Sequence, residues 1–383
     1  MARDVLPAVR DWLVTNGCDA TERHVRRSLD ALGVVAEPET LTRLVAQLTA
    51  DLVGAGALQP LLDLPGVTDV LVNGPGSVWV DTGTGLRDSG ISFADEAAVR
   101  ALAQRMAAQA GRRLDDASPF VDARLPDGVR LHAALPPLAS PGTLISLRVP
   151  AQRRFDLDRL VDAGSVSEAG AEWLRAMMSA RCGFLVTGST GSGKTTVLRA
   201  LLECVPADER IVAIEESAEL QLRHPHFVRL ETRIDNAEGR GRVDMTDLMR
   251  QALRMRPDRV VVGEVRGAEV TALLNAMNTG HEGSCGTVHA NDVAALPARI
   301  ESLALAAGLN RTAVHSQLAA GLDAVLHVRR DHDGRRRIDQ LGVVIPDAGT
   351  GLVAVRPLLT FTGTRPRLHL PGHPLLRRLE RWR

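Results

Sequence analysis

The feature that most constrains this chain is the octapeptide Gly-Ser-Thr-Gly-Ser-Gly-Lys-Thr at residues 188–195. It matches the pattern G-x-x-x-x-G-K-[ST] in full, follows the apolar segment 184–187, and precedes a stretch with helical periodicity. Glycines let the backbone curl so that its N–H groups converge on phosphate oxygens, and the following helix presents the positive end of its dipole. The segment therefore predicts a phosphate-binding loop (P-loop) between a buried strand and a helix.

Two residues of this loop have specific chemistry. Lys194 is expected to reach the β and γ phosphates of a nucleotide, and Thr195 to offer its hydroxyl to Mg²⁺. Lys194 is also the only lysine among 46 basic residues. A GC-rich genome accounts for the arginine bias, but the surviving lysine stands where a planar guanidinium does not fit. The candidate nucleotide-binding residues are Gly188, Ser189, Thr190, Gly191, Ser192, Gly193, Lys194, Thr195 and Thr196.

Composition limits the class of protein. The 383 residues are 45% hydrophobic and 24% charged, with 46 basic against 46 acidic residues, so we expect a folded protein and no direct binding to nucleic acid. The four cysteines form no CxxC pair, which favours a reduced, metal-free protein. We find no apolar run of membrane-spanning length and no signal-like N-terminus, so we expect a cytoplasmic location.

The pattern along the chain predicts four parts. Residues 1–57 have helical periodicity, and 58–150 combine short strands with one helix at 95–110, as in a small α+β domain. Residues 155–345 alternate strands and helices, which predicts a parallel sheet covered by helices. Residues 346–383 form an Arg-rich C-terminal extension, whose last twenty residues are expected to be solvated.

Acidic residues end two further strand candidates. Glu215 and Glu216 follow the apolar segment 211–214, and Glu264 follows 260–262. In open parallel sheets ligands bind at the carboxyl edge, where a carboxylate can orient or deprotonate an attacking water or hold Mg²⁺. We expect Glu264 to bind the metal, directly or through water. Glu215 or Glu216 is expected to be the catalytic acid, and position favours Glu215.

A fourth cluster, 279–291, is rich in glycine and contains His281 and His289. Two histidines without a third ligand at metal spacing make a poor metal site. We expect a polar loop beside the nucleotide, in which His281 senses phosphate and His289 has a structural or coupling role.

These four stretches, taken in this order, resemble the secretion-superfamily ATPases of type II secretion, type IV pili and type IV secretion. Residues 214–220 are similar to that family's Asp box, 254–267 to its Walker B segment, and 279–291 to its His box. Residues 112–132 and 221–233 are similar to the CpaF/TadA-type ATPase of tight-adherence (Flp) pili. The resemblance covers about 60–345. It departs at Glu216, where the family pattern has Asp, and at Cys285, which should be neutral.

The resemblance implies a RecA-like P-loop NTPase domain preceded by a small α+β (PAS-like) domain, with a linker at about 150–160. It implies ATP and Mg²⁺ as ligands, a homohexameric ring, and hydrolysis that drives inner-membrane platform proteins, so that the protein lies peripherally on the inner face of the membrane. Arg130 and Arg148 match positions where these ATPases carry nucleotide-contacting arginines, and they are candidate arginine fingers.

Three alternatives remain open from the sequence. The same core could serve a conjugative DNA-transfer ATPase of type IV secretion, a DNA motor or helicase, or a regulator that binds nucleotide without hydrolysis. Neutral charge and an aromatic content of 3% argue against single-strand stacking platforms. The intact loop and its acidic partners argue against a regulator.

Overall fold

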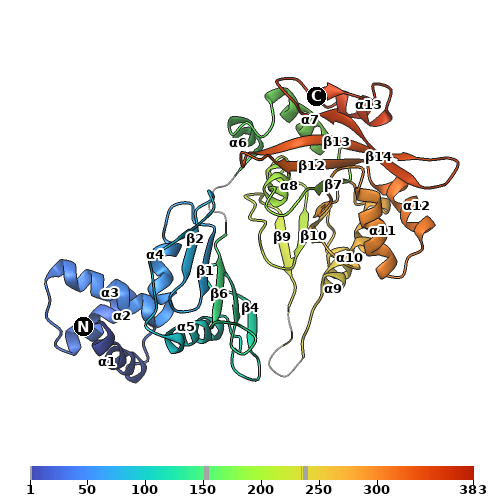
Figure 1. Ribbon diagram of the computed structural model, residues 1–383. Coiled ribbons are helices and arrows are strands. Elements are labelled where there is room, and N and C mark those ends of the chain that lie inside the picture. The colour runs from blue at the N-terminus through green and yellow to red at the C-terminus, as the bar shows by residue number, and fades with distance from the viewer. Residues whose placement is uncertain (1, 151–154, 234, 236–239) are drawn as a thin grey trace. The chain divides into compact units, whose positions relative to one another are not determined.

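The computed structural model describes residues 2–150, 155–233, 235 and 240–383, and it divides the chain into two compact units, Met1–Arg153 and Arg154–Arg383 (Figure 1). Part of the expected linker, residues 151–154, lies outside the described residues. The sequence predicted four parts, and the finer division within these two units stays a prediction. Each unit is described by itself below.

The first unit begins with three helices that share a small apolar core, in which Val9, Val25, Leu29 and Leu48 are fully buried. Their apolar residues recur at helical spacing, so each helix turns one stripe toward the other two. The helices are α1 (Ala2–Thr15), α2 (Glu22–Ala31) and α3 (Pro38–Val53). The helical character predicted for residues 1–57 is confirmed, with a short 3₁₀ turn at Gly56–Leu58 and α4 (Gln59–Leu62) closing the segment.

An antiparallel sheet of six strands, in the order β3-β2-β1-β6-β5-β4, completes this unit. Alternate residues such as Val70, Leu131 and Leu147 are buried in a core that also takes in helix α5. The elements are β1 (Asp69–Asn73), β2 (Val78–Asp81), β3 (Leu86–Asp88), α5 (Glu96–Gln109), β4 (Phe120–Arg124), β5 (Arg130–Ala134) and β6 (Leu144–Arg148). The predicted small α+β domain is confirmed, although β3 and β4 were not foreseen.

The second unit contains a nine-stranded sheet in the order β15-β14-β13-β12-β7-β11-β10-β8-β9. The run from β12 to β9 is parallel, and β13 to β15 are antiparallel. The strands are β7 (Phe184–Thr187), β8 (Ile211–Glu215), β9 (Phe227–Glu231), β10 (Arg259–Val265), β11 (Cys285–Val288), β12 (Ala324–Arg330), β13 (Arg336–Pro346), β14 (Val353–Thr360) and β15 (Arg367–Leu368).

Helices cover both faces of this sheet, because successive strand residues point to opposite sides. Phe184 and Val186 pack in one core with α7 and α8, whereas Leu185 packs in a second core with α9 to α12. The helices are α6 (Leu157–Asp162), α7 (Glu168–Ser179), α8 (Lys194–Leu202), α9 (Met245–Ala252), α10 (Glu269–Asn278), α11 (Leu296–Ala306), α12 (Arg311–Gly321) and α13 (Pro374–Glu380). The predicted parallel α/β sheet is confirmed.

The expectation that the last twenty residues are solvated is wrong. Helix α13 buries Leu375, Leu376 and Leu379 in the same core as α7, and Arg383 pairs with Glu172 at 2.8 Å. The many arginines of this segment suggested a solvated extension. Its leucines, however, are spaced so that they lie on one side of a helix. The segment is therefore part of the folded second unit.

Candidate nucleotide site

The P-loop connects β7 to α8 at the carboxyl edge of the parallel strands (Figure 1). Gly193 has a φ of +99° directly before the first residue of α8, and Gly188 has a φ of +153°. A Cβ atom on Gly188 would lie 2.3 Å from the carbonyl oxygen of Val328, so no larger residue fits there. The glycines of the motif therefore stand where the backbone requires them.

Lys194 folds back over this loop. Its side-chain ammonium donates to the carbonyl oxygens of Gly188 at 3.2 Å and Ser189 at 3.0 Å, and only 8% of the residue is exposed. Burial lowers the pKa of Lys194, and the nearby Glu264 opposes that shift. An ammonium held in a partly dry loop is well placed to neutralise phosphate charge.

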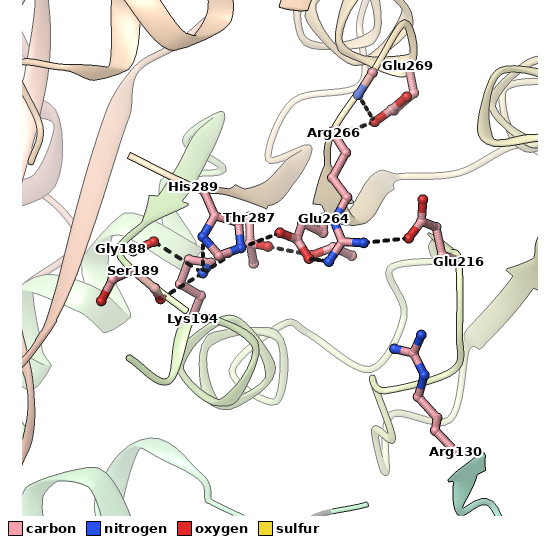
Figure 2. Close-up of polar contacts among 12 residues, drawn as sticks. Arg130, Gly188, Ser189, Lys194, Glu216, Glu264, Arg266, Glu269, Thr287 and His289 are labelled. Atoms are coloured by element: carbon pink, nitrogen blue, oxygen red, sulfur yellow. Dashed lines mark hydrogen bonds and ion pairs between the residues drawn. The ribbon is translucent and has the colours of Figure 1, made fainter. Parts of the chain in front are cut away.

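The strand order brings His289 and Glu264 to the same edge. Strand β11 pairs with β7 and β10 pairs with β11, so His289, after β11, and Glu264, near the end of β10, lie beside the P-loop. The Nε2 atom of His289 lies 2.5 Å from Oε1 of Glu264. Nζ of Lys194 lies 3.4 Å from Nδ1 and 3.3 Å from Nε2 of the same imidazole (Figure 2).

These contacts define the state of His289. Burial, and next the positive charge of Lys194, lower the pKa of His289, which favours the neutral imidazole, while Glu264 opposes that shift. The Nε2 atom lies against the carboxylate of Glu264, and the ammonium of Lys194 lies at nearly the same distance from both ring nitrogens. His289 therefore links the loop lysine to the strand carboxylate.

Arg266 extends this cluster by one further acid. It donates to Oε2 of Glu264 at 2.7 Å and to Oε2 of Glu216 at 2.9 Å, as Figure 2 shows. Its own backbone N–H, and that of Gly267, donate to Oε1 of Glu269 at 2.6 and 2.8 Å. Neither Arg266 nor Glu269 was predicted from the sequence to be a site residue. The Walker B-like stretch contained Arg266, but the role of Glu269 depends on a turn that the sequence did not reveal.

Glu215 is buried at the end of β8, with 2% of the residue exposed. Its Oε1 accepts from the backbone N–H groups of Glu219 at 3.0 Å and Leu220 at 2.9 Å, so the carboxylate holds the following turn. Burial raises the pKa of Glu215 to about 7. Among the described residues, its buried Oε2 has no hydrogen-bond partner. Glu215 and Glu216 thus differ clearly in environment: one is enclosed and the other pairs with Arg266.

The expected position of His281 is wrong. Residues 285–288 form β11 rather than part of a loop, and Cys285 pairs with Phe184 while Val288 pairs with Thr187. His281 therefore precedes the amino end of β11, at the opposite edge of the sheet from the P-loop, and it is His289 that lies beside the lysine. The glycines around Cys285 weaken the sequence pattern of a strand, so β11 was not predicted. This strand separates the two histidines and places them at opposite edges of the sheet.

Arg130 and Arg148 face each other across β5 and β6 of the first unit. Arg130 lies 3.7 Å from Asp122, and Nε of Arg148 donates to Asp69 at 3.0 Å. Both side chains are accessible from the sheet's surface. Their assignment as arginine fingers stays a prediction.

The donor set at the P-loop suits Mg²⁺. Thr195 places a hydroxyl in the first turn of α8, and Glu264 supplies carboxylate oxygens at the end of β10. Mg²⁺ prefers such hard oxygens and completes its shell with phosphates and water, so two protein ligands are enough. Both carboxylate oxygens of Glu264 already face Arg266 or His289. If Glu264 bound Mg²⁺ directly, the metal would therefore replace the contact of one carboxylate oxygen with Arg266 or His289.

A P-loop before a helix, with an acidic residue on a neighbouring parallel strand and helices on both faces, defines a RecA-like P-loop NTPase domain. The family model described as "Type II/IV secretion system protein" matches residues 51–342. The chain belongs to this family, and the resemblance to secretion ATPases is confirmed.

Individual relatives agree with this assignment. The chain is 55% identical over 317 residues to a protein of Mycobacterium tuberculosis H37Rv named as a conjugal transfer protein, covering 81% of this chain and 90% of the relative. It is 32% identical over 282 residues to the conjugal transfer protein TrbB of Rhizobium radiobacter, covering 72% and 83%. The crystal structure of the pilus retraction motor PilT with ADP shares the fold, with a TM-score of 0.54, 18% identity and 85% of each chain covered.

No helix in the described part of the chain combines the length and apolar character that crossing a membrane requires.

Proposed function

We propose that this protein is an ATP hydrolase, converting ATP and water to ADP and phosphate, and that it acts as the motor of a secretion-type machine. The observation that carries the proposal is the continuous contact from Lys194 through His289 to Glu264 at the P-loop. A loop that bound phosphate without hydrolysis would not need a lysine, a histidine and a carboxylate in one cluster. The arrangement suits phosphoryl transfer, in which positioning and charge neutralisation supply most of the rate.

Each residue has a distinct part in the proposed reaction. The loop N–H groups and Lys194 bind the β and γ phosphates, and the lysine neutralises charge that develops there. Thr195 and Glu264 would hold Mg²⁺, which neutralises phosphate charge when bound. His289 and Arg266 fix the orientation of the Glu264 carboxylate. Glu215 is the proposed general base, because a pKa of about 7 lets a carboxylate accept a proton near neutral pH.

Arg130 and Arg148 are the proposed arginine fingers. A positive group beside the γ phosphate can raise the rate by a factor of about 10³ or more. Both come from the first unit, so we propose that the complete site needs both units, and that it forms in a homohexameric ring of the kind the family resemblance implies. Such a ring would pass the motion of hydrolysis to inner-membrane platform proteins, with the ATPase bound peripherally to the inner face of the membrane.

The machine that we propose first is a tight-adherence (Flp) pilus. The support is the similarity of residues 112–132 and 221–233 to the CpaF/TadA-type ATPases. The second candidate is conjugal transfer by type IV secretion, and it is supported by the names of two relatives that are 55% and 32% identical. The balanced charge of 46 basic and 46 acidic residues favours a motor that does not itself bind DNA.

The test is a chromosomal Lys194→Ala substitution in the organism that encodes the protein. Surface pili are counted by electron microscopy, and plasmid transfer is counted as transconjugants, in the variant and in the wild type. Loss of pili with normal transfer supports the pilus motor. Loss of transfer with normal pili supports the conjugation motor, and no change in either process contradicts a motor role in both.

A further inference from the structure

Arg266 is shared by two carboxylates that come from different strands. Its Nη2 atom donates to Oε2 of Glu264 at 2.7 Å, and its Nη1 atom donates to Oε2 of Glu216 at 2.9 Å (Figure 2). Glu264 belongs to β10, and Glu216 directly follows β8, the neighbouring strand. A guanidinium presents its donors as a planar fork, so one side chain can bind both acids at once. The cluster thus contains one cation with two anionic partners.

The backbone on both sides of this bridge is held by hydrogen bonds. The backbone N–H of Arg266 donates to Oε1 of the buried Glu269 at 2.6 Å, and the carbonyl oxygen of Glu216 accepts from Oγ1 of Thr232 at 3.2 Å. The side chain of Arg266 is 54% exposed, and that of Glu264 is 24% exposed. Because an exposed side chain changes rotamer readily, Arg266 can leave Glu264 without a movement of the backbone.

The two partners of Glu264 differ in what each would lose by leaving it. Nε2 of His289 lies 2.5 Å from Oε1 of Glu264, and the same imidazole contacts the ammonium of Lys194. Breaking this contact would remove the link between the P-loop and β10. Arg266 would instead keep its contact with Glu216. Since an ion pair between partly exposed groups is weak, little free energy opposes an exchange at Oε2 of Glu264.

We propose that Arg266 and Mg²⁺ compete for the same carboxylate oxygen of Glu264: Arg266 holds Oε2 before the metal binds, and it pairs with Glu216 alone when the metal takes that oxygen. Glu216 is then a positioning residue, which acts on the metal site through Arg266. The inference rests on the proposed nucleotide function and adds to it a role for Glu216 that differs from the proposed general base, Glu215.

The exchange predicts opposite effects of two substitutions on metal binding. In Arg266→Met the metal has no competitor for Oε2 of Glu264, so Mg²⁺ should bind more tightly. In Glu216→Gln the arginine loses its second anionic partner and stays on Glu264, so Mg²⁺ should bind more weakly. Charge alone predicts the same two signs, because one variant loses a positive and the other a negative charge near the metal. The double variant separates the two explanations, since Glu216 acts only through Arg266 in the exchange.

The test measures by calorimetry the affinity of the full-length protein for the non-hydrolysable ATP analogue AMP-PNP, once with Mg²⁺ and once with EDTA. The ratio of the two affinities gives the contribution of the metal without any turnover. We expect this ratio to rise about threefold to tenfold in Arg266→Met and to fall by a similar factor in Glu216→Gln, as for one partly exposed charged contact. In the double variant the ratio should equal that of Arg266→Met.

Glu219→Gln, which removes an exposed acid of the same segment, is the matched control for charge, and its effect on the ratio should be the same with and without Arg266. Additive effects of Glu216→Gln and Arg266→Met would overturn the exchange, and so would an unchanged ratio in both single variants. If the wild type bound AMP-PNP neither with Mg²⁺ nor with EDTA, the nucleotide function itself would fail. Nucleotide binding by the wild type thus separates that failure from the failure of the exchange alone.

Discussion

The Nε2 atom of His289 lies 2.5 Å from Oε1 of Glu264, and the same imidazole lies 3.3 Å from the ammonium of Lys194. These three side chains come from three segments that are far apart in the sequence and meet at one edge of the sheet. A neutral histidine between a cation and an anion can bind both without adding charge. The geometry makes His289 the structural centre of the proposed hydrolytic site.

Replacing His289 should therefore impair turnover more than binding. His289→Ala removes the contact that orients Glu264, and we expect kcat to fall about 10- to 100-fold while the affinity for ADP changes less than threefold. His281→Ala, at the opposite edge of the sheet, is the matched comparison and should keep kcat near the wild-type value. Steady-state phosphate release and ADP calorimetry measure the two effects. A larger loss in His281→Ala than in His289→Ala would contradict the placement of the two histidines.

Glu264→Gln should reduce turnover about 100-fold or more. The amide keeps the shape of the side chain but loses the charge that faces Arg266 and that would hold Mg²⁺. The Mg²⁺ concentration needed for half-maximal activity should rise as well. Glu282→Gln, an exposed acid before β11, serves as the control and should leave both quantities unchanged. A Glu264→Gln enzyme with the wild-type metal requirement would remove Glu264 from the site.

Glu215→Gln should change how stability depends on pH. Burial raises the pKa of Glu215 in the folded state from 4.5 to about 7, so the folded state holds a proton that the unfolded chain releases. The group's stabilising contribution is full below pH 4.5 and is lost as the pH rises to about 7, an effect on the order of 3 kcal/mol.

Urea unfolding at pH 5 and pH 8 measures this effect. The free energy of unfolding of the wild type should fall more between these values than that of Glu215→Gln, which cannot titrate there. Equal pH dependence in the two proteins would contradict the raised pKa. If Glu215 is the general base, the variant should also lose kcat at every pH while still binding ADP.

Arg130→Ala and Arg148→Ala should each reduce kcat by about 100-fold or more without preventing ring formation. Specific activity of the wild type should rise with protein concentration as rings assemble by mass action. Size-exclusion chromatography of each sample, run beside the rate measurements, separates assembly from chemistry. Arg87→Ala, an exposed arginine in β3 of the same unit, is the control. If both variants hydrolysed ATP at the wild-type rate, the proposal that Arg130 and Arg148 take part in hydrolysis would be contradicted.

Local sequence signals predicted much of this fold. The P-loop glycines, the apolar segments of β7, β8 and β10, and the periodic helices on both faces have strong local patterns, and each forms as expected. Strand β11 was missed because its sequence, Cys-Gly-Thr-Val, is short and contains Gly286, with Gly283 two residues before it. Its place between β7 and β10 is set by the sheet, which no local pattern specifies.

The site residues that belong to one local motif could be predicted from the sequence. Those whose role depends on contacts between remote segments of the chain could not. Lys194 could be identified from its motif alone. The prominence of His289 over His281 depends on β11 crossing the sheet, and the link of Glu216 to Glu264 depends on Arg266 reaching both. Arg336, the first residue of β13, is 145 residues from Gly191, its hydrogen-bond partner in the P-loop, so only the folded chain reveals their contact.

The most direct test of the central claim is the rate of phosphate release from ATP by the full-length protein with Mg²⁺, measured beside Lys194→Ala and Lys194→Arg. The account predicts steady turnover by the wild type and a loss of about 1,000-fold or more in both variants, because the first lacks the charge and the second replaces a compact ammonium with a planar fork. Circular dichroism would show that all three proteins are folded. Turnover by either variant at the wild-type rate, or its absence from an assembled wild type, would contradict the account.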